Sequence, residues 1–207
     1  MPFLTESDTE RIEQAVEAAE AHTAAEFVTV IAGASGHYLY LPTLAAAAAM
    51  LLLSGIALIV PWPFPVTVGQ FYMGQVLGFI ACYGLFRWWP VRRRLVPRHI
   101  QHERARHRAH QTFLDLGLAS TRYRTGVLFF VSVAEHYVEI ITDRGVGSVV
   151  DDVVWADTVS HFAATVRQGR IADGVVDAVN ACARVLAERL PPRAGDVDEL
   201  PNLPVEL

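Results

Sequence analysis

The sequence predicts an α/β fold: an α/β/α sandwich around a small mixed sheet of about three to four strands, interrupted by an inserted two-helix transmembrane hairpin. Segments rich in β-branched and aromatic residues occur before and after a long apolar block, and helical patterns flank them. The block runs from Phe27 to Phe86 without one Asp, Glu, Lys or Arg, in a chain of 207 residues. The polar segments on its two sides therefore form one discontinuous domain.

The first polar segment predicts a helix followed by a strand. Residues 5–22 have the pattern of an amphipathic helix, and Thr5 with Asp8 resembles a capping box. Apolar residues recur there at helical spacing, at Ile12, Val16 and Ala19. Glu26–Ala32, EFVTVIA, then has the composition of a strand. Because a lone strand needs partners, we expect it to pair with strands that follow the apolar block.

The apolar block predicts two membrane spans, within a hairpin of residues 38–89. Leu39–Val60 and Val66–Phe86 are each long enough to cross a hydrocarbon core of roughly 30 Å. Prolines in the short PWPFP link allow only an antiparallel hairpin. A pair of buried core helices is the alternative. Small residues four apart, at Ala45 and Ala49 and at Gly74 and Gly78, would hold the hairpin together or support a homo-oligomer.

Arginines after the second predicted span indicate an orientation. They are Arg87, Arg92, Arg93, Arg94 and Arg98. The positive-inside rule places this side in the cytoplasm, and a hairpin returns the N-terminal side to it. We therefore expect a protein of the inner (cytoplasmic) membrane with both termini cytoplasmic. The lipid bilayer would then be a partner, with the five arginines contacting anionic headgroups.

The second polar segment completes the predicted domain, which comprises residues 1–33 and 98–190. A helix is expected at 98–116, ending at Gly117. Two strands and two helices follow, at 127–133, 137–142, 152–168 and 173–190. The Pro-rich and acidic tail, 191–207, reads as irregular.

Composition excludes several functions. The net charge of −5 argues against nucleic acid as a partner. Cys82 and Cys182 lie in different segments and form neither a metal motif nor a disulfide framework. Ser132 and Ser148 lack the turn of a nucleophile elbow. No motif of a nucleophilic enzyme is therefore present.

Several blocks of this sequence resemble the TPM domain family. They are EFVTVIA after an amphipathic helix, RTGVLFFVSVAEHYVEIITDRGV at 124–146, the acid pair Asp151-Asp152, and RQGRIADGVVDAV at 167–179. The resemblance covers residues 5–33 and 98–190, and it is greatest to short bacterial members with a transmembrane hairpin inside the domain. It implies an α/β/α sandwich with a small mixed sheet. Some members are reported as acid phosphatases, some bind a divalent metal at a shallow acidic site, and others assemble or maintain membrane complexes.

The chain departs from the common family pattern at two places. Arg144-Gly145 stands where many members have an aromatic residue before glycine, and Thr125-Gly126 stands where many have Asn-Gly. An amide or acid at the second place would help to hold a metal, so its absence argues against metal binding and phosphatase activity.

Acidic residues near the end of the third strand form the candidate metal site. Asp143, Asp151, Asp152 and Asp157 cluster in sequence there. Carboxylates suit Ca²⁺ or Mg²⁺, which take several oxygen ligands. In the alternative interpretation, which we favour, Asp151 or Asp152 caps the following helix and the others are solvated. Glu26 would add a ligand, pair with Arg144, or stand exposed at the start of its strand.

Histidines on the predicted helix 98–116 form a second candidate site. They are His99, His102, His107 and His110, with Glu103 among them. A row of His and Glu on one face would suit Zn²⁺. Interleaved arginines repel a cation, however, so we expect a solvated helix.

Two functions remain. The first is a membrane-anchored, non-enzymatic TPM-like module that binds a partner protein or supports the assembly or maintenance of a membrane complex. The second is a divalent-metal-dependent, acid-phosphatase-like hydrolase that uses the acidic cluster with Ca²⁺ or Mg²⁺.

Overall fold

A computed structural model describes residues 3–35, 40–59, 61, 65–88, 97–150, 152–192 and 199–207. The chain divides into two compact units, each treated by itself below. The first comprises Met1–Ser35 and His102–Leu207, and the second comprises Gly36–Gln101.

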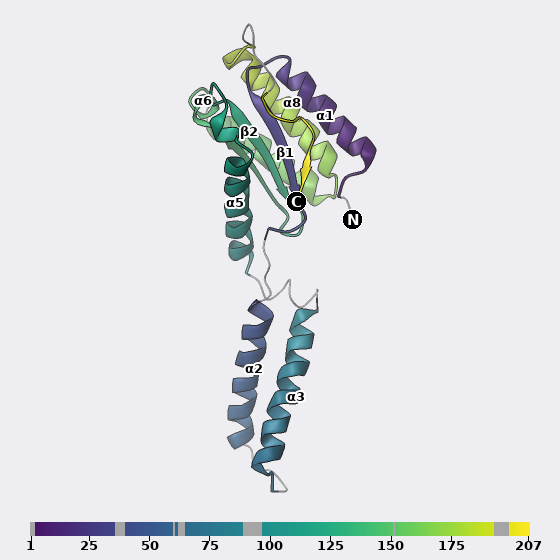
Figure 1. The fold of residues 1–207 in the computed structure, drawn as a ribbon, viewed down its shortest axis with the longest axis vertical. Coiled ribbons are helices and arrows are strands. Elements are labelled where there is room, and N and C mark those ends of the chain that lie inside the picture. The colour runs from purple at the N-terminus through teal and green to yellow at the C-terminus, as the bar shows by residue number, and fades with distance from the viewer. Residues whose placement is uncertain are drawn as a thin grey trace. The chain divides into compact units, whose positions relative to one another are not determined.

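The first unit is built on a four-stranded mixed sheet (Figure 1). Its strands are β1 (Glu26–Ala32), β2 (Gly126–Ser132), β3 (Tyr137–Thr142) and β4 (Val205–Glu206), in the order β3-β2-β1-β4. β1 pairs in parallel with β2 over its whole length, and β2 pairs antiparallel with β3. The predicted pairing of the early strand with the later strands is confirmed. The parallel partners lie far apart in sequence because a parallel pair needs a crossover rather than a turn.

One face of this sheet carries three helices: α1 (Glu6–Glu20), α7 (Asp152–Arg167) and α8 (Ile171–Arg189). Their apolar stripes meet alternate residues of β1 and β2 in one core, in which Phe27 and Phe129 have ring centroids 5.9 Å apart. Phe162 of α7 packs edge-on to Phe129, at 6.5 Å. The capping box predicted for α1 is present, because Thr5 accepts from the Asp8 amide and the Asp8 side chain accepts from the Thr5 amide.

The opposite face carries α5 (Arg98–Asp115) and a short 3₁₀ helix, η1 (Leu118–Ser120). The core on this side consists of Val28, Val30, Leu128, Phe130, Phe113 and Leu118 with smaller neighbours. Because side chains alternate along a strand, β1 and β2 supply apolar residues to both faces. That explains why both strands are buried at every position. The described residues thus form a mixed α/β fold with seven α-helices, one of them the single turn α6 (Arg144–Gly147).

The chain end departs from the sequence-based expectation of an irregular tail. β4 pairs in parallel with β1 through Val30↔Val205 and Ile31↔Glu206. The Leu207 amide donates to the Ile31 carbonyl at 3.0 Å, and the Gly33 amide donates to the Leu207 carbonyl at 2.8 Å. Glu206 also accepts from the Leu4 amide at 3.2 Å. Two residues are too few to show a period of alternation, so the sequence pattern could not reveal this strand.

The second unit contains two antiparallel helices, α2 (Tyr40–Ile59) and α3 (Val68–Arg87). Gln75 of α3 donates to Ser54 Oγ of α2 at 2.7 Å, and Ser54 donates to the Met50 carbonyl. Gly78 faces Met50, whose Cε would lie 2.8 Å from an added Cβ. Large apolar side chains elsewhere on both helices are exposed, such as Leu51 at 75% and Val68 at 88%.

The structure contradicts the predicted membrane location. No helix among the described residues is both long and apolar enough to cross a membrane. Polar and small residues lower the hydropathy of α3, with Gln70, Gln75 and four glycines in its 20 residues. Two spans, and cytoplasmic termini inferred from them, are therefore not supported. The proline link lies largely outside the described residues. Arg87 and Arg98 are exposed, whereas Arg92, Arg93 and Arg94 lie outside the described part, so the role of these arginines stays a prediction.

A buried polar cluster ties the end of β1 to the turn between β2 and β3. Ser132 Oγ donates to Glu135, which is only 5% exposed. The Ser35 amide donates to the same carboxylate oxygen at 3.1 Å, and the Ser35 and Ser132 hydroxyls lie 2.7 Å apart. A buried carboxylate is tolerated when hydrogen bonds replace its lost water. The cluster therefore fixes the chain just before it leaves the sheet.

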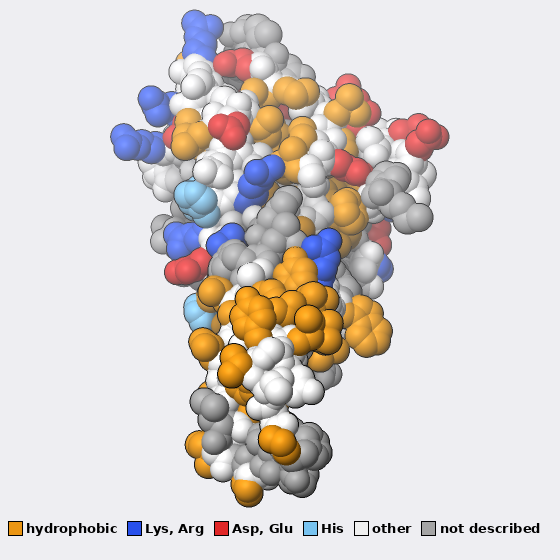
Figure 2. Space-filling view, turned by 60° about the horizontal axis from the view of Figure 1, so that its bottom comes forward, with side chains coloured by type: hydrophobic (Ala, Val, Ile, Leu, Met, Phe, Trp, Pro, Cys, Tyr) orange, Lys and Arg blue, Asp and Glu red, His pale blue; other side chains and the backbone are white. Residues whose placement is uncertain are grey.

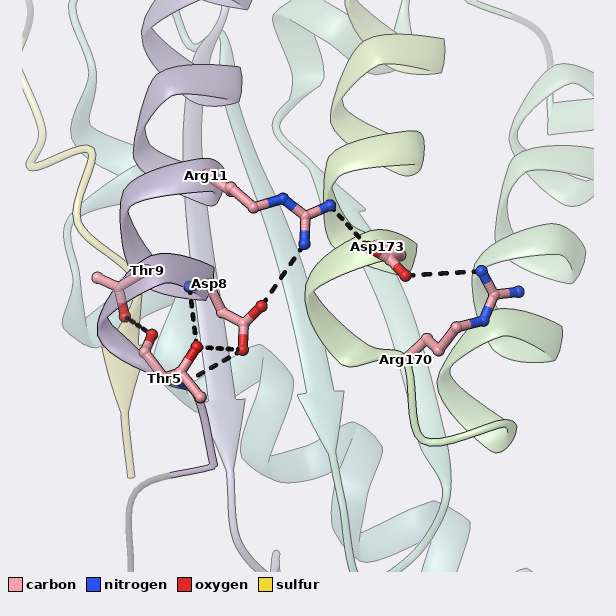
Figure 3. Close-up of polar contacts among 6 residues, drawn as sticks. All are labelled: Thr5, Asp8, Thr9, Arg11, Arg170 and Asp173. Atoms are coloured by element: carbon pink, nitrogen blue, oxygen red, sulfur yellow. Dashed lines mark hydrogen bonds and ion pairs between the residues drawn. The ribbon is translucent and has the colours of Figure 1, made fainter.

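Ion pairs also link the outer helices of the first face (Figure 3). Arg11 of α1 donates to Asp173 of α8 at 2.7 Å, and Asp173 pairs with Arg170 at 3.5 Å. The hydrogen bond from Arg11 is the main reason that the pKa of Asp173 lies below its ordinary value of 3.8. This network joins two helix N-termini, where a negative charge is favourable.

The lowered pKa of Asp173 predicts a pH-dependent contribution to stability. A carboxyl group with a lowered native pKa stabilises the fold above its unfolded pKa, and the stabilisation is lost as the pH falls through the native pKa. Asp173→Asn should therefore unfold at a lower urea concentration than the parent at pH 7. The difference should begin to shrink near pH 3.8 and disappear below the native pKa. Glu17→Gln, an exposed change on α1, is the control; a pH-independent difference for Asp173→Asn would contradict the linkage.

Candidate functional site

Three strand ends meet at one edge of the sheet and bring two carboxylates to it. Glu26 begins β1 and lies opposite Gly126, which begins β2. Asp143 follows β3, and its amide donates to the Gly126 carbonyl at 2.9 Å. Gly126 thus lies between the two acidic residues across the sheet.

Both acidic residues belong to the sheet face that α5 and η1 cover. Val28, two residues after Glu26, lies in the core of that face, and so does Ile141, two residues before Asp143. Side chains two apart on a strand point to the same face. Leu118 of η1 packs directly over Gly126 on this face, since a Cβ there would lie 2.6 Å from the Leu118 carbonyl oxygen. A side chain between the two acids would displace η1.

Both carboxylates are more than nine-tenths buried, with Glu26 at 9% and Asp143 at 7% exposure. Asp143 caps α6 by accepting from the Arg144 amide at 2.7 Å through Oδ1. Its Oδ2 is buried and has no hydrogen-bond partner in the described part of the chain. Burying an ionised carboxylate is costly unless a hydrogen bond or a cation compensates it. This arrangement could hold a hard cation such as Ca²⁺ or Mg²⁺.

The turn that positions Asp143 fits tightly against the loop before β2. The Gly145 amide donates to the Arg124 carbonyl at 2.9 Å. A Cβ on Gly145 would lie 2.5 Å from that oxygen and 2.7 Å from the Tyr123 carbonyl oxygen. Arg124 itself has a positive φ of 55°. The glycine of the Asp143-Arg144-Gly145 segment is therefore required by the close approach of two backbones.

Asp157, predicted to join these acids, lies elsewhere. It is exposed on α7 and lines a groove of about 630 Å³ between α1, α7 and α8, which cover the opposite sheet face. His161, one turn later, has its Nε2 3.7 Å from Asp177 Oδ2 of α8 in the same groove. We did not predict the proximity of His161 and Asp177. The sequence offered one signal for this groove, which is the spacing of four residues that places Asp157 and His161 on the same face of a helix.

The remaining predicted ligands cannot be placed. Asp151 and the Asp152 side chain lie outside the described residues. In the part of the chain that is described, no three His, Cys, Asp or Glu residues are grouped so as to hold a metal ion. Glu26 and Asp143 are thus the two predicted ligands that the structure brings to one edge.

Polar residues of the histidine-rich helix α5 contact β3, where the rings of His102 and Tyr137 have centroids 5.4 Å apart. His110 Nε2 lies 3.6 Å from Glu139 Oε1, and Arg106 Nε lies 3.8 Å from the same oxygen. Burial, and then the negative charge of Glu139, raises the pKa of neighbouring Tyr137 well above its ordinary value. His99, His102 and His107 are exposed, as in the interpretation of a solvated helix.

Two potential nucleophiles, Cys182 and Ser132, are buried in the core. Cys182 is 1% exposed in α8, and burial raises the pKa of its thiol to about 12. The thiol is therefore protonated at neutral pH and a poor nucleophile. Ser132 is fully buried and donates to Glu135.

Comparison with known proteins gives a family match for part of the chain. The family model of the TPM domain matches residues 93–185, which include α5, β2, β3, α6, α7 and most of α8. No curated protein matches. The NMR structure of the BA42 protein from the psychrophilic bacterium Bizionia argentinensis is similar, with a TM-score of 0.61 over 99% of this chain and 96% of that chain. At 20% identity, this similarity shows the fold alone.

Two glycines of one turn offer a matched test of how the site is positioned. Gly145→Ala should lower the free energy of unfolding by about 1–3 kcal/mol, because the new Cβ overlaps backbone oxygens. Gly147→Ala should change it by about 0.5 kcal/mol or less, since a Cβ there meets only Thr142 Oγ1 at 3.7 Å. Urea unfolding of both variants measures the difference. Equal effects would show that the close approach at Gly145 does not determine the turn.

Proposed function

We propose that this chain is a TPM-like binding module without a catalytic role, and that its α2–α3 hairpin docks another protein and so supports the assembly of a complex. The observation that carries the proposal is the exposure of the hairpin's large apolar side chains. They include Leu51, Leu52, Leu53, Ile56 and Ile59 on α2, and Tyr72, Met73, Leu77 and Ile80 on α3, each more than half exposed. Apolar patches of this extent on a protein surface mark interaction sites.

The location of these side chains supports docking rather than folding as their role. Figure 2 shows hydrophobic side chains gathered over the hairpin. The domain core is closed on both sheet faces by other helices, so the hairpin is not needed to bury it. Burial of apolar surface contributes roughly 25 cal/mol of favourable free energy per Å². A partner that covers the hairpin would therefore bind through it, while the sheet domain remains folded.

Site-specific photocrosslinking tests this function. A photoreactive amino acid at Leu53, which is 52% exposed and lines a groove of the hairpin, should give a discrete adduct with a second polypeptide in cells that express the full chain. The same amino acid at Glu17, on the outer face of α1, is the matched control and should give none. Adducts at neither position, or equal adducts at both, would contradict docking through the hairpin. The mass of the adduct identifies the type of partner.

A second candidate function is a divalent-metal-dependent phosphomonoester hydrolase at the Glu26–Asp143 edge. The observation that favours it is the burial of two carboxylates on either side of Gly126, one with an oxygen that has no hydrogen-bond partner in the described chain. A cation bound there would supply Lewis-acid chemistry toward a phosphoryl oxygen. Glu26 and Asp143 would hold the cation.

Metal binding at this edge has a readout that is independent of activity. A saturating excess of Ca²⁺, about a hundred times its dissociation constant, should stabilise the parent by about 2.7 kcal/mol. Asp143→Asn should abolish that stabilisation, whereas Asp157→Asn, on the opposite face, should keep it. Hydrolysis of p-nitrophenyl phosphate with Ca²⁺ or Mg²⁺ would then test the reaction. No response of the parent to either ion in thermal unfolding would remove this candidate.

A further inference from the structure

We propose that the partner of the α2–α3 hairpin is the same hairpin of a second copy, so that two chains pair into a four-helix bundle. This inference rests on the proposed docking function and names its partner. It begins from the seam between α2 and α3, where the polar groups satisfy one another. Gln75 donates to Ser54 and Ser54 to the Met50 carbonyl, each at 2.7 Å. The surfaces beside the seam are consequently left apolar.

Two grooves flank this seam. One, of about 360 Å³, is lined by Leu51 and Val76 among others, and the other, of about 470 Å³, by Leu53 and Gly74. Both share Met50, Ser54 and Gln75, the seam residues. At 100° per residue, the remaining lining residues of the two grooves fall on opposite sides of the shared ones on each helix. The hairpin thus presents a groove between two helices on each side, which is the surface that a bundle buries.

Charge restricts what can occupy such a groove. From Phe27 to Phe86 the chain has no Asp, Glu, Lys or Arg, so a charged partner would lose solvation without finding a counter-charge. The partner must present uncharged helices of matching length. This chain supplies two, since α2 and α3 each have 20 residues and are each about 30 Å long. A second copy is therefore complementary in both charge and length.

The available area is sufficient for a stable pair. Two adjacent helices, each about 10 Å wide and about 30 Å long, offer roughly 600 Å² of flat area on one side. A standard specific interface buries about 800 Å² of accessible surface per partner. Side-chain relief increases the accessible surface above the flat area, so one side of the hairpin reaches the standard size.

Gly74 marks where a partner helix approaches. A Cβ on Gly78 would collide with Met50 inside the seam, whereas a Cβ on Gly74 meets nothing within 4 Å although Gly74 lines a groove. Gly84 is equally open but lines neither described groove of the hairpin. A bulky side chain at Gly74 leaves the hairpin intact and fills the space that a second helix would take. Gly84 offers a control of the same type on the same helix.

The test is the molar mass of the purified full chain by light scattering after gel filtration. The parent should have twice the chain mass of 22.8 kDa. Gly74→Leu should weaken the dimer at least tenfold and shift the mass toward one chain, while Gly84→Leu stays dimeric. Circular dichroism confirms that both variants keep their helix content.

Three results would overturn self-pairing: a parent with the mass of one chain, equal loss of the dimer in both variants, or recovery of the parent as single copies on phosphatidylcholine vesicles. If the parent is a single chain but the photoreactive residue at position 53 still crosslinks to a polypeptide of another mass in cells, the docking function stands and only self-pairing fails. If neither a dimer nor an adduct forms, both fail.

Discussion

The parallel pairing of β1 with β2 is the constraint on which the rest of the molecule depends. It joins residues from before the hairpin to residues after it, in register from Glu26↔Gly126 to Ala32↔Ser132. Closing so long a loop costs conformational entropy, although the cost rises only slowly with loop length. Two fully buried strands repay it, because each contributes apolar side chains to both cores. The hairpin can therefore occupy the crossover without weakening the domain.

The same pairing has a different consequence at each of its ends. At the start of the two strands it places Glu26 beside Gly126, and Asp143, which follows β3, lies on the other side of Gly126. At the other end, the Glu135 carboxylate accepts from Ser35 and Ser132 and so holds the chain that leads toward the hairpin. One end thus concentrates the buried negative charge of two carboxylates. At the other end, hydrogen bonds from two serines compensate the buried carboxylate of Glu135. The candidate metal site and the cluster of Ser35, Ser132 and Glu135 lie at opposite ends of one strand pair.

Much of this fold could be predicted because hydrophobic periodicity and the need of strands for partners are local signals. The range of β3 and the capping box at Thr5 follow from such patterns. α6 could not be predicted, since a four-residue turn with two glycines has no period. At the site, Glu26 and Asp143 could be placed at strand ends, but Asp157 was misplaced because proximity in sequence says nothing about which face a later helix covers. The uncharged block predicted helices correctly, whereas its assignment to a membrane rested on length and absence of charge, and the amides and glycines of α3 lower its hydropathy.

The short strand β4 covers part of the outer edge of β1. Without it, β1 would present an open row of backbone donors and acceptors beside a fully buried, hydrophobic sequence, and such edges template intermolecular strand addition and aggregation. β4 occupies this row at Val30 and Ile31, and Glu206 places a carboxylate there that would repel another negatively charged chain. Protein engineering that alters residues 205–207 would therefore change the colloidal behaviour of the protein before it changed its core.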